Sequence, residues 1–217
     1  MVRINQVLPP RPSQYDRKCQ RIDYELLQKQ DFAGEVTLIY GKPPVSELPE
    51  AVEERYWRVE DRQSRLSGQA GLPVLHIASF RRKSIIPIVE QTMARIHRTR
   101  EDIEWLLLDE PPADFASFDA WIDPAVDVDD RDGFVAEAQV AGKIVVATRT
   151  PFNIKRLEKG RTGFLVPAGD PNELTHAILA ALFKPEVSDP KIEAAKQTIS
   201  KYHPRQRLRA LLLLLNA

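Results

Sequence analysis

The sequence predicts an α/β fold with one mainly parallel sheet and helices on both faces. Three observations indicate this. Short β-branched or apolar runs alternate with helically periodic segments along residues 74–166. Helices begin at a capping residue followed by proline, as at Asp170-Pro171. The runs 103–108 and 144–147 are mainly apolar, which is typical of strands covered on both faces.

The first part of the chain, residues 1–60, reads strand, helix, strand, strand. The expected strands are 2–8, 35–40 and 56–59. Ser13 has the form of a helix cap. Cys19 lies on the apolar face of the expected helix, so we expect it to pack in a core rather than act as a nucleophile.

A polar, aperiodic stretch at 61–72 is the expected linker, and strand–helix alternation resumes after it. The expected strands are 74–79, 103–108, 118–122, 144–147 and 163–166. Helices are expected to begin near residues 84, 133, 151, 170, 189 and 204.

Composition excludes several classes of protein. Lys and Arg number 31 against 31 Asp and Glu, so a nucleic-acid binder with a broad basic face is not expected. The longest apolar run, 210–215, is far shorter than the ~20 residues that span a bilayer. The chain has one cysteine, which excludes an internal disulfide, and no typical signal peptide begins it. We therefore expect a cytoplasmic protein.

Residues 132–182 read DGFVAEAQVAGKIVVATRTPFNIKRLEKGRTGFLVPAGDPNELTHAILAAL. This segment contains six features in order: an acidic residue, Gly-Phe, a helix with a glutamate, an apolar strand, Thr-Gly-Phe-Leu-Val-Pro and a Gly-Asp-Pro turn. This order resembles the C-terminal domain of the glycogen-synthase-like and sucrose-synthase-like glycosyltransferases with the GT-B fold. The resemblance implies a Rossmann-like domain that binds a nucleotide sugar.

The departures from the family imply a strongly shortened, reduced GT-B-like architecture. We expect one compact α/β domain over residues 1–217. In it, 1–60 resembles a remnant of the opening of the N-terminal domain, 61–72 is the linker, and 73–217 resembles the nucleotide-sugar domain. Most of the acceptor-binding domain is missing. A helix and a strand that help to hold the nucleotide base in the family are also missing after Leu108.

An acidic group is the first candidate for a binding site. Glu137 keeps the family's spacing to the next glycine, so the resemblance aligns it with the glutamate that contacts the ribose. The sugar-contacting acid is Asp129 by strict spacing, or Asp132 if three residues were deleted after Phe134. The helix start at Gly133 offers backbone N–H groups to phosphate. Alternatively, Glu137 is a solvated helix residue and the aspartates form an ordinary polar loop.

A basic segment is the second candidate. The resemblance implies that cations at the end of the first strand of this domain seat the diphosphate, where positioned charge aids its departure. Here the family's Gly-Arg pair has become Ala78-Ser79, and Lys83 aligns only with a one-residue gap. Arg81 or Arg82 could supply the lost charge. The alternative is a basic loop without a ligand.

No cofactor or metal is expected. The acidic run 127–133 fails the EF-hand register, because Gly133 at loop position six would make Val128 the first ligand. The leading hypothesis is a metal-independent, retaining transfer of sugar from a nucleotide sugar to an unknown acceptor. The alternative is a catalytically degenerate relative that acts as a nucleotide- or sugar-binding or assembly module.

The last segment, 203–217, carries arginines at 205, 207 and 209 followed by five leucines. It is expected to form a helix that packs back on the fold. Five successive leucines are more apolar than one helix face needs. A contact with a second copy of the chain or with a partner protein is therefore the alternative use of this helix.

Overall fold

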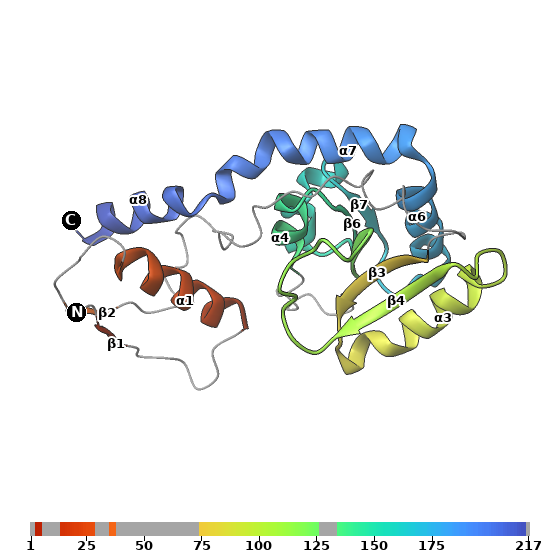
Figure 1. Ribbon diagram of the computed structural model, residues 1–217, viewed down its shortest axis with the longest axis horizontal. Helices are drawn as coiled ribbons and strands as arrows, with labels where there is room; N and C mark the ends of the chain where they lie inside the picture. The colour runs from red at the N-terminus through yellow and green to blue at the C-terminus, as the bar shows by residue number, and fades with distance from the viewer. Residues whose placement is uncertain (1–2, 6–13, 29–34, 38–73, 126–133, 216–217) are drawn as a thin grey trace. The chain divides into compact units, whose positions relative to one another are not determined.

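The computed structural model describes residues 3–5, 14–28, 35–37, 74–125 and 134–215 (Figure 1). The chain divides into two compact units, a smaller one of Met1–Glu54 with Ile199–Ala217 and a larger one of Arg55–Thr198. The expected linker at 61–72 and the expected strand at 56–59 lie outside the described residues. The domain boundaries derived from the sequence therefore stay a prediction.

The larger unit is built on a five-stranded sheet. In spatial order its strands are β4 (Ile103–Leu108), β3 (Leu75–Phe80), β5 (Ala120–Asp123), β6 (Ile144–Thr148) and β7 (Phe164–Val166). All neighbouring strands are parallel. The strand order changes direction between β3 and β5, and α/β sheets bind their ligands at such a switch point, outside the carboxyl ends of the strands.

Helices cover both faces of this sheet (Figure 1). On one face α3 (Ile86–Ile96) and α6 (Pro171–Phe183) contact each other and enclose an aliphatic core with β3, β5 and β6. On the other face α4 (Val135–Val140) contacts β5 and β6, and α7 (Pro185–Thr198) packs against α4 and α6. A parallel α/β sheet with helices on both faces is thus confirmed.

Short helical turns complete the larger unit. The 3₁₀ turn η3 (Lys83–Ile85) precedes α3, and α5 (Pro151–Arg156) is followed by the 3₁₀ turn η4 (Glu158–Gly160). Pro190 lies inside α7, so the expected helix start at 189 is wrong. The sequence offers two prolines five residues apart, and the first, Pro185, is the one that begins the helix.

The edge strand β4 corrects another expectation. Ile103 is buried, but Glu104 is exposed and residues 105–108 are half-buried. The apolar run therefore does not mark a strand covered on both faces. Apolar composition identifies the strand but not its neighbours, and here the described sheet ends at β4.

The smaller unit pairs a helix from each end of the chain. Its helices are α1 (Gln14–Gln28) and α8 (Pro204–Leu215), with the 3₁₀ turn η5 (Ile199–Tyr202), and its strands β1 (Arg3–Asn5) and β2 (Glu35–Thr37) are parallel. The two helices contact each other, and Leu208 of α8 packs against Ile22 and Leu26 of α1. Cys19 is buried on α1.

A buried ion pair also joins these two helices. The side chains of Asp23 and Arg207 are 0% and 2% exposed. Arg207 donates from Nε to Asp23 Oδ1 at 2.5 Å and from Nη2 to Oδ2 at 2.8 Å. This bidentate geometry is the strongest form of an arginine–carboxylate contact. Within the described residues, no helix is long and apolar enough to cross a membrane.

Thr92 offers a test of packing in α3. It is 0% exposed, and its hydroxyl has no hydrogen-bond partner among the described residues. Because an unsatisfied buried hydroxyl costs about 1–3 kcal/mol, Thr92→Val is expected to raise the free energy of unfolding by about 1 kcal/mol. Urea denaturation measures this. Thr99→Val is the control, because the Thr99 hydroxyl donates to Ile96 O at 3.3 Å and its loss should not stabilise. A destabilised Thr92→Val variant would contradict the expectation.

The pair Arg100–Asp102 predicts a pH dependence. The hydrogen bonds from Arg100, at 2.8 and 2.5 Å, are the main cause that lowers the pKa of Asp102 below its usual value. A carboxyl with a lowered pKa stabilises the fold above its unfolded pKa of about 3.9, and this contribution disappears as the pH falls through the folded pKa. The melting temperature of the wild type should exceed that of Asp102→Asn at pH 7, and the two should converge toward pH 3. Arg100→Gln should converge in the same way. A difference that stays constant with pH would refute the assignment.

Candidate functional site

The carboxyl ends of β3, β5 and β6 meet at one edge of the sheet. The basic segment 81–83 follows β3, Asp123 ends β5 and Thr148 ends β6. Strand order changes direction here, so this edge is where a ligand site is expected. Chemically distinct side chains from separate parts of the sequence converge at this place.

The basic residues do not act as one cluster. Arg81 is exposed, and its Nε lies 3.1 Å from Asp109 Oδ1, beyond the end of β4. Arg82 turns the other way, toward β5, where its Nη2 lies 3.4 Å from Asp123 Oδ1. Lys83 opens η3 and is exposed. The neighbouring arginines therefore point to opposite sides of β3, and Arg82 is the one on the side of the switch point.

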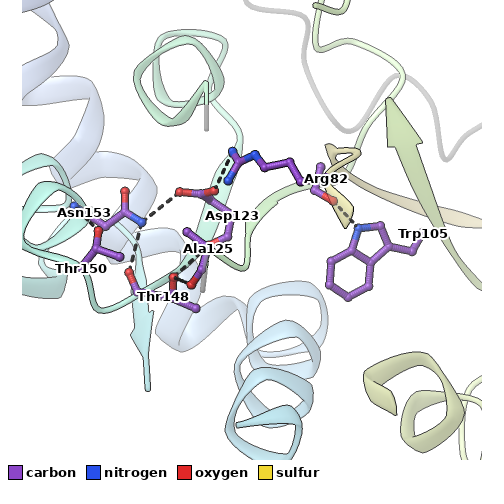
Figure 2. Close-up of polar contacts among 8 residues, drawn as sticks. Arg82, Trp105, Asp123, Ala125, Thr148, Thr150 and Asn153 are labelled. Carbon is purple, nitrogen blue, oxygen red and sulfur yellow. Dashed lines mark hydrogen bonds and ion pairs between the residues drawn. The ribbon is translucent and has the colours of Figure 1, made fainter. Parts of the chain in front are cut away.

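A buried polar network continues from Arg82 along this edge (Figure 2). Asn153 Nδ2 donates to Asp123 Oδ2 at 2.9 Å and to the carbonyl oxygen of Thr148 at 3.1 Å. The Thr148 hydroxyl donates to the carbonyl oxygen of Ala125 at 2.6 Å. These contacts tie the ends of β5 and β6 to the first turn of α5. We call Arg82, Asp123, Thr148 and Asn153 the carboxyl-edge network.

Sequence reasoning missed the buried members of this network. The sequence pattern instead indicated the acidic run at 127–133. Asp123 is the last residue of the apolar strand β5, and Asn153 lies in the first turn of α5, the helix that follows the apolar strand β6. Polar residues directly beyond buried strands of a parallel sheet are the signal that could have found them.

The start of α4 lies beside the end of β3. The Phe134 ring packs on the Phe80 ring with centroids 4.9 Å apart. Phe134 caps α4 with a left-handed backbone (φ 51°), which is uncommon for a bulky side chain. Because Phe80 directly precedes the basic segment, this contact brings the start of the glutamate-bearing helix close to the end of β3.

Glu137 is fully buried, with 0% of its surface exposed. The alternative of a solvated helix residue is therefore wrong, and its contact with a ribose stays a prediction. Asp129, Asp132 and Gly133 lie outside the described residues. Helix α4 has six residues and begins at Val135, later than expected. So short a helix sums few peptide dipoles, and the phosphate-binding role expected of its start loses most of its electrostatic support.

Ser79, which stands where the family has an arginine, has a structural role. It is 1% exposed and accepts a hydrogen bond from Trp105 Nε1 at 2.8 Å. This bond ties the end of β3 to β4. A ligand at the carboxyl edge would not reach the Ser79 hydroxyl.

Aromatic side chains fill the connection between β4 and β5. The connection between β4 and β5, residues 109–119, contains no helix or strand, although parallel strands are usually joined through a helix. Its Phe115 and Phe118 are buried and pack against Trp121 of β5, with ring centroids 5.1 and 6.3 Å apart. Phe80 lies on the same tryptophan at 6.0 Å. We call Phe80, Phe115, Phe118, Trp121 and Phe134 the aromatic cluster.

Metal ligation has no candidate in the described part of the chain: no group of three or more His, Cys, Asp or Glu side chains there could hold an ion.

Comparison with a family model gives a direct match. Residues 85–183 match the model described as "Glycosyl transferases group 1". This range includes α3, the edge strand, the carboxyl-edge network except Arg82, and α6. No curated protein matches the sequence.

Solved structures of glycosyltransferases share the fold. HepE from Anabaena, in complex with UDP and glucose, has a TM-score of 0.59 at 17% identity, over 84% of this chain and 57% of that protein. Sucrose-phosphate synthase from Thermosynechococcus elongatus has a TM-score of 0.58 at 14% identity, over 90% and 56%. A glycosyltransferase from Rickettsia africae has a TM-score of 0.55 at 13% identity, over 90% and 60%. The chain thus spans 60% or less of these proteins. The expected resemblance of this chain to GT-B glycosyltransferases is thus confirmed at the level of the fold.

Proposed function

We propose that this glycosyltransferase-like chain binds a nucleotide sugar at the carboxyl edge of its sheet and transfers the sugar to an acceptor. The observation that supports the proposal is the contact of Phe134, at the start of the helix that carries Glu137, with Phe80, the last residue before the basic segment. The edge lies at the switch point of a parallel sheet, and part of it lies within the region that matches group 1 glycosyltransferases.

Each group has a distinct proposed role. Arg82 and Lys83 bind the diphosphate, because positioned cations stabilise the charge that develops on a departing diphosphate. Glu137 accepts hydrogen bonds from the ribose hydroxyls. An acid of the 129–132 segment, Asp129 or Asp132, holds the sugar hydroxyls beside the backbone of Gly133. With cations in the diphosphate site, the transfer proceeds without a metal and retains the configuration of the sugar.

A protein contact through α8 is part of the proposal. The chain spans 60% or less of the solved proteins it matches. The proposed occupant of this helix is a second copy of the chain or a partner protein. On α8, Leu213 is 67% exposed, which gives this helix an apolar side chain that a partner could cover.

Isothermal calorimetry with a panel of nucleotide sugars tests the proposal. UDP-glucose is the first probe, because HepE is also solved in complex with it. We expect binding that weakens about 10-fold or more in Lys83→Ala and in Glu137→Gln, since each loses a charge-assisted contact worth about 1.5–3 kcal/mol. Arg98→Ala is the matched control, because Arg98 is an exposed cation in the turn that precedes β4, at the opposite edge of the sheet. Absence of binding to every nucleotide sugar at millimolar concentration would reject the proposal.

A non-catalytic binding module is the second candidate. Two observations favour it. The Ser79 hydroxyl is buried and accepts a hydrogen bond from Trp105, and aromatic side chains occupy the connection that follows β4. The two candidates differ in turnover. Slow release of UDP from UDP-glucose, abolished by Glu137→Gln, supports the transferase, whereas binding without any release supports the module.

A further inference from the structure

A buried carboxylate and a buried amide lie behind Arg82 at the carboxyl edge (Figure 2). We propose that Asp123 and Asn153 are positioning residues, which hold the Arg82 guanidinium toward the diphosphate of a bound nucleotide. The inference rests on the proposed function. It adds which residues orient the arginine that binds the diphosphate.

Burial separates the roles of the three side chains. The side chain of Asp123 is 2% exposed and Asn153 is 0% exposed, and both are engaged within the carboxyl-edge network. Asn153 Nδ2 donates to Asp123 Oδ2 and to Thr148 O, and Asp123 Oδ1 faces Arg82. The Arg82 side chain is 18% exposed, so it is the one of these three side chains most open to a ligand, and the other two act through it.

A comparison of two arginine–aspartate pairs in this chain supports the assignment. Arg207 donates to Asp23 at 2.5 and 2.8 Å, and its side chain is 2% exposed, as in a pair that serves structure. The contact from Arg82 Nη2 to Asp123 Oδ1 is 3.4 Å long. This contact is longer than either contact of Arg207. An arginine guanidinium also suits the planar, bidentate recognition of phosphate oxygens, which is the role proposed for Arg82.

Asn153 fixes the carboxylate at a cost in stability. Its Nδ2 faces two acceptors, Asp123 Oδ2 and the carbonyl oxygen of Thr148, and this fixes which way the amide points. Its Oδ1 is then buried without a hydrogen-bond partner among the described residues. A buried acceptor without a donor is unfavourable by about 1–3 kcal/mol. Retaining such a group is typical of a residue with a role beyond folding.

Calorimetry with UDP, inorganic diphosphate and uridine tests the inference. Arg82→Ala is expected to weaken UDP binding about 10- to 100-fold, since a charge-assisted contact is lost. Asp123→Asn and Asn153→Leu should each weaken UDP binding about 5- to 50-fold, because a misplaced guanidinium loses its alignment with the diphosphate. Uridine binding should stay within about twofold of the wild type, because no phosphate is involved. Arg98→Ala controls for the loss of one positive charge.

A double-variant cycle separates positioning from general stability. If Asp123 acts through Arg82, then Asp123→Asn should have no further effect on UDP affinity in the Arg82→Ala background. Asn153→Leu removes the unpartnered oxygen together with the two hydrogen bonds that Nδ2 donates, so its melting temperature is expected to fall. The positioning role predicts that its UDP affinity falls while its uridine affinity does not, whereas a merely structural loss would lower both.

The outcomes distinguish this inference from the proposed function. Absence of binding to UDP and UDP-glucose would overturn the nucleotide site, and inorganic diphosphate would then test Arg82 without the base. Normal UDP binding in Arg82→Ala would overturn the inference while the nucleotide site stands. Weak binding in Arg82→Ala with normal binding in both Asp123→Asn and Asn153→Leu would overturn the positioning role alone.

Discussion

Replacement of Asp23 by alanine is expected to destabilise the smaller unit by about 3–5 kcal/mol. The substitution leaves the Arg207 guanidinium buried, at 2% exposure, without the carboxylate that accepts its Nε and Nη2 hydrogens. The desolvation of a buried cation is then not offset by its counter-charge. Hydrogen exchange of the backbone amides in α1 and α8, measured at increasing denaturant concentration, reports the loss of unfolding free energy in this unit.

Two further variants make this result interpretable. Asp23→Leu combined with Arg207→Met replaces the pair by apolar side chains of similar volume and should recover most of the stability. Glu25→Ala removes an exposed carboxylate from the same helix and should change stability by less than about 0.5 kcal/mol. Unchanged exchange in Asp23→Ala would mean that the ion pair does not hold α1 against α8.

Replacement of Phe115 by alanine is expected to cost the larger unit about 3–5 kcal/mol. Phe115 is 1% exposed and packs edge-on against Trp121 and against Phe118, with centroid distances of 5.1 and 6.1 Å. No helix covers Trp121 from the connection between β4 and β5, so the loss of this ring opens a cavity that the loop cannot refill with backbone. Urea denaturation followed by tryptophan fluorescence measures the change.

Ser117→Ala is the control in the same connection, because Ser117 is exposed. Phe115→Leu should lie between the wild type and Phe115→Ala, since it leaves a smaller cavity. Equal stability of Phe115→Ala and Ser117→Ala would show that the aromatic cluster does not stabilise this connection.

Helices and strands that are specified by neighbouring residues, such as a capping side chain, could be predicted from the sequence. Helix α6 begins as expected, because the Asp170 side chain accepts from the backbone N–H groups of Asn172 and Glu173 and so caps the helix. The Gly163 of the Thr-Gly-Phe motif also has a physical cause. A Cβ at this position would lie 2.9 Å from both Val145 O and Leu157 Cδ2, so only glycine fits there. This part of the motif serves packing rather than ligand contact.

The remaining features depend on which strands are neighbours, and local patterns do not carry that information. Arg81 and Arg82 are identical in type and adjacent in sequence, yet one meets Asp109 and the other Asp123. That choice follows from β4 and β5 lying on opposite sides of β3. The pairing of Asp123 with Asn153 likewise joins residues 30 positions apart. Sequence reasoning found the basic segment but could not assign its partners.

The ion pair between α1 and α8 bears on how this protein is made in the cell. Its two residues are 184 positions apart. Ribosomes add about 5–20 residues per second, so the second helix emerges roughly 10–40 s after the first. During that interval the apolar face of the early helix, which includes Ile22 and Leu26, lacks Leu208 of α8, against which it packs in the folded protein. A chaperone that shields nascent chains is therefore expected to associate with this segment until α8 emerges.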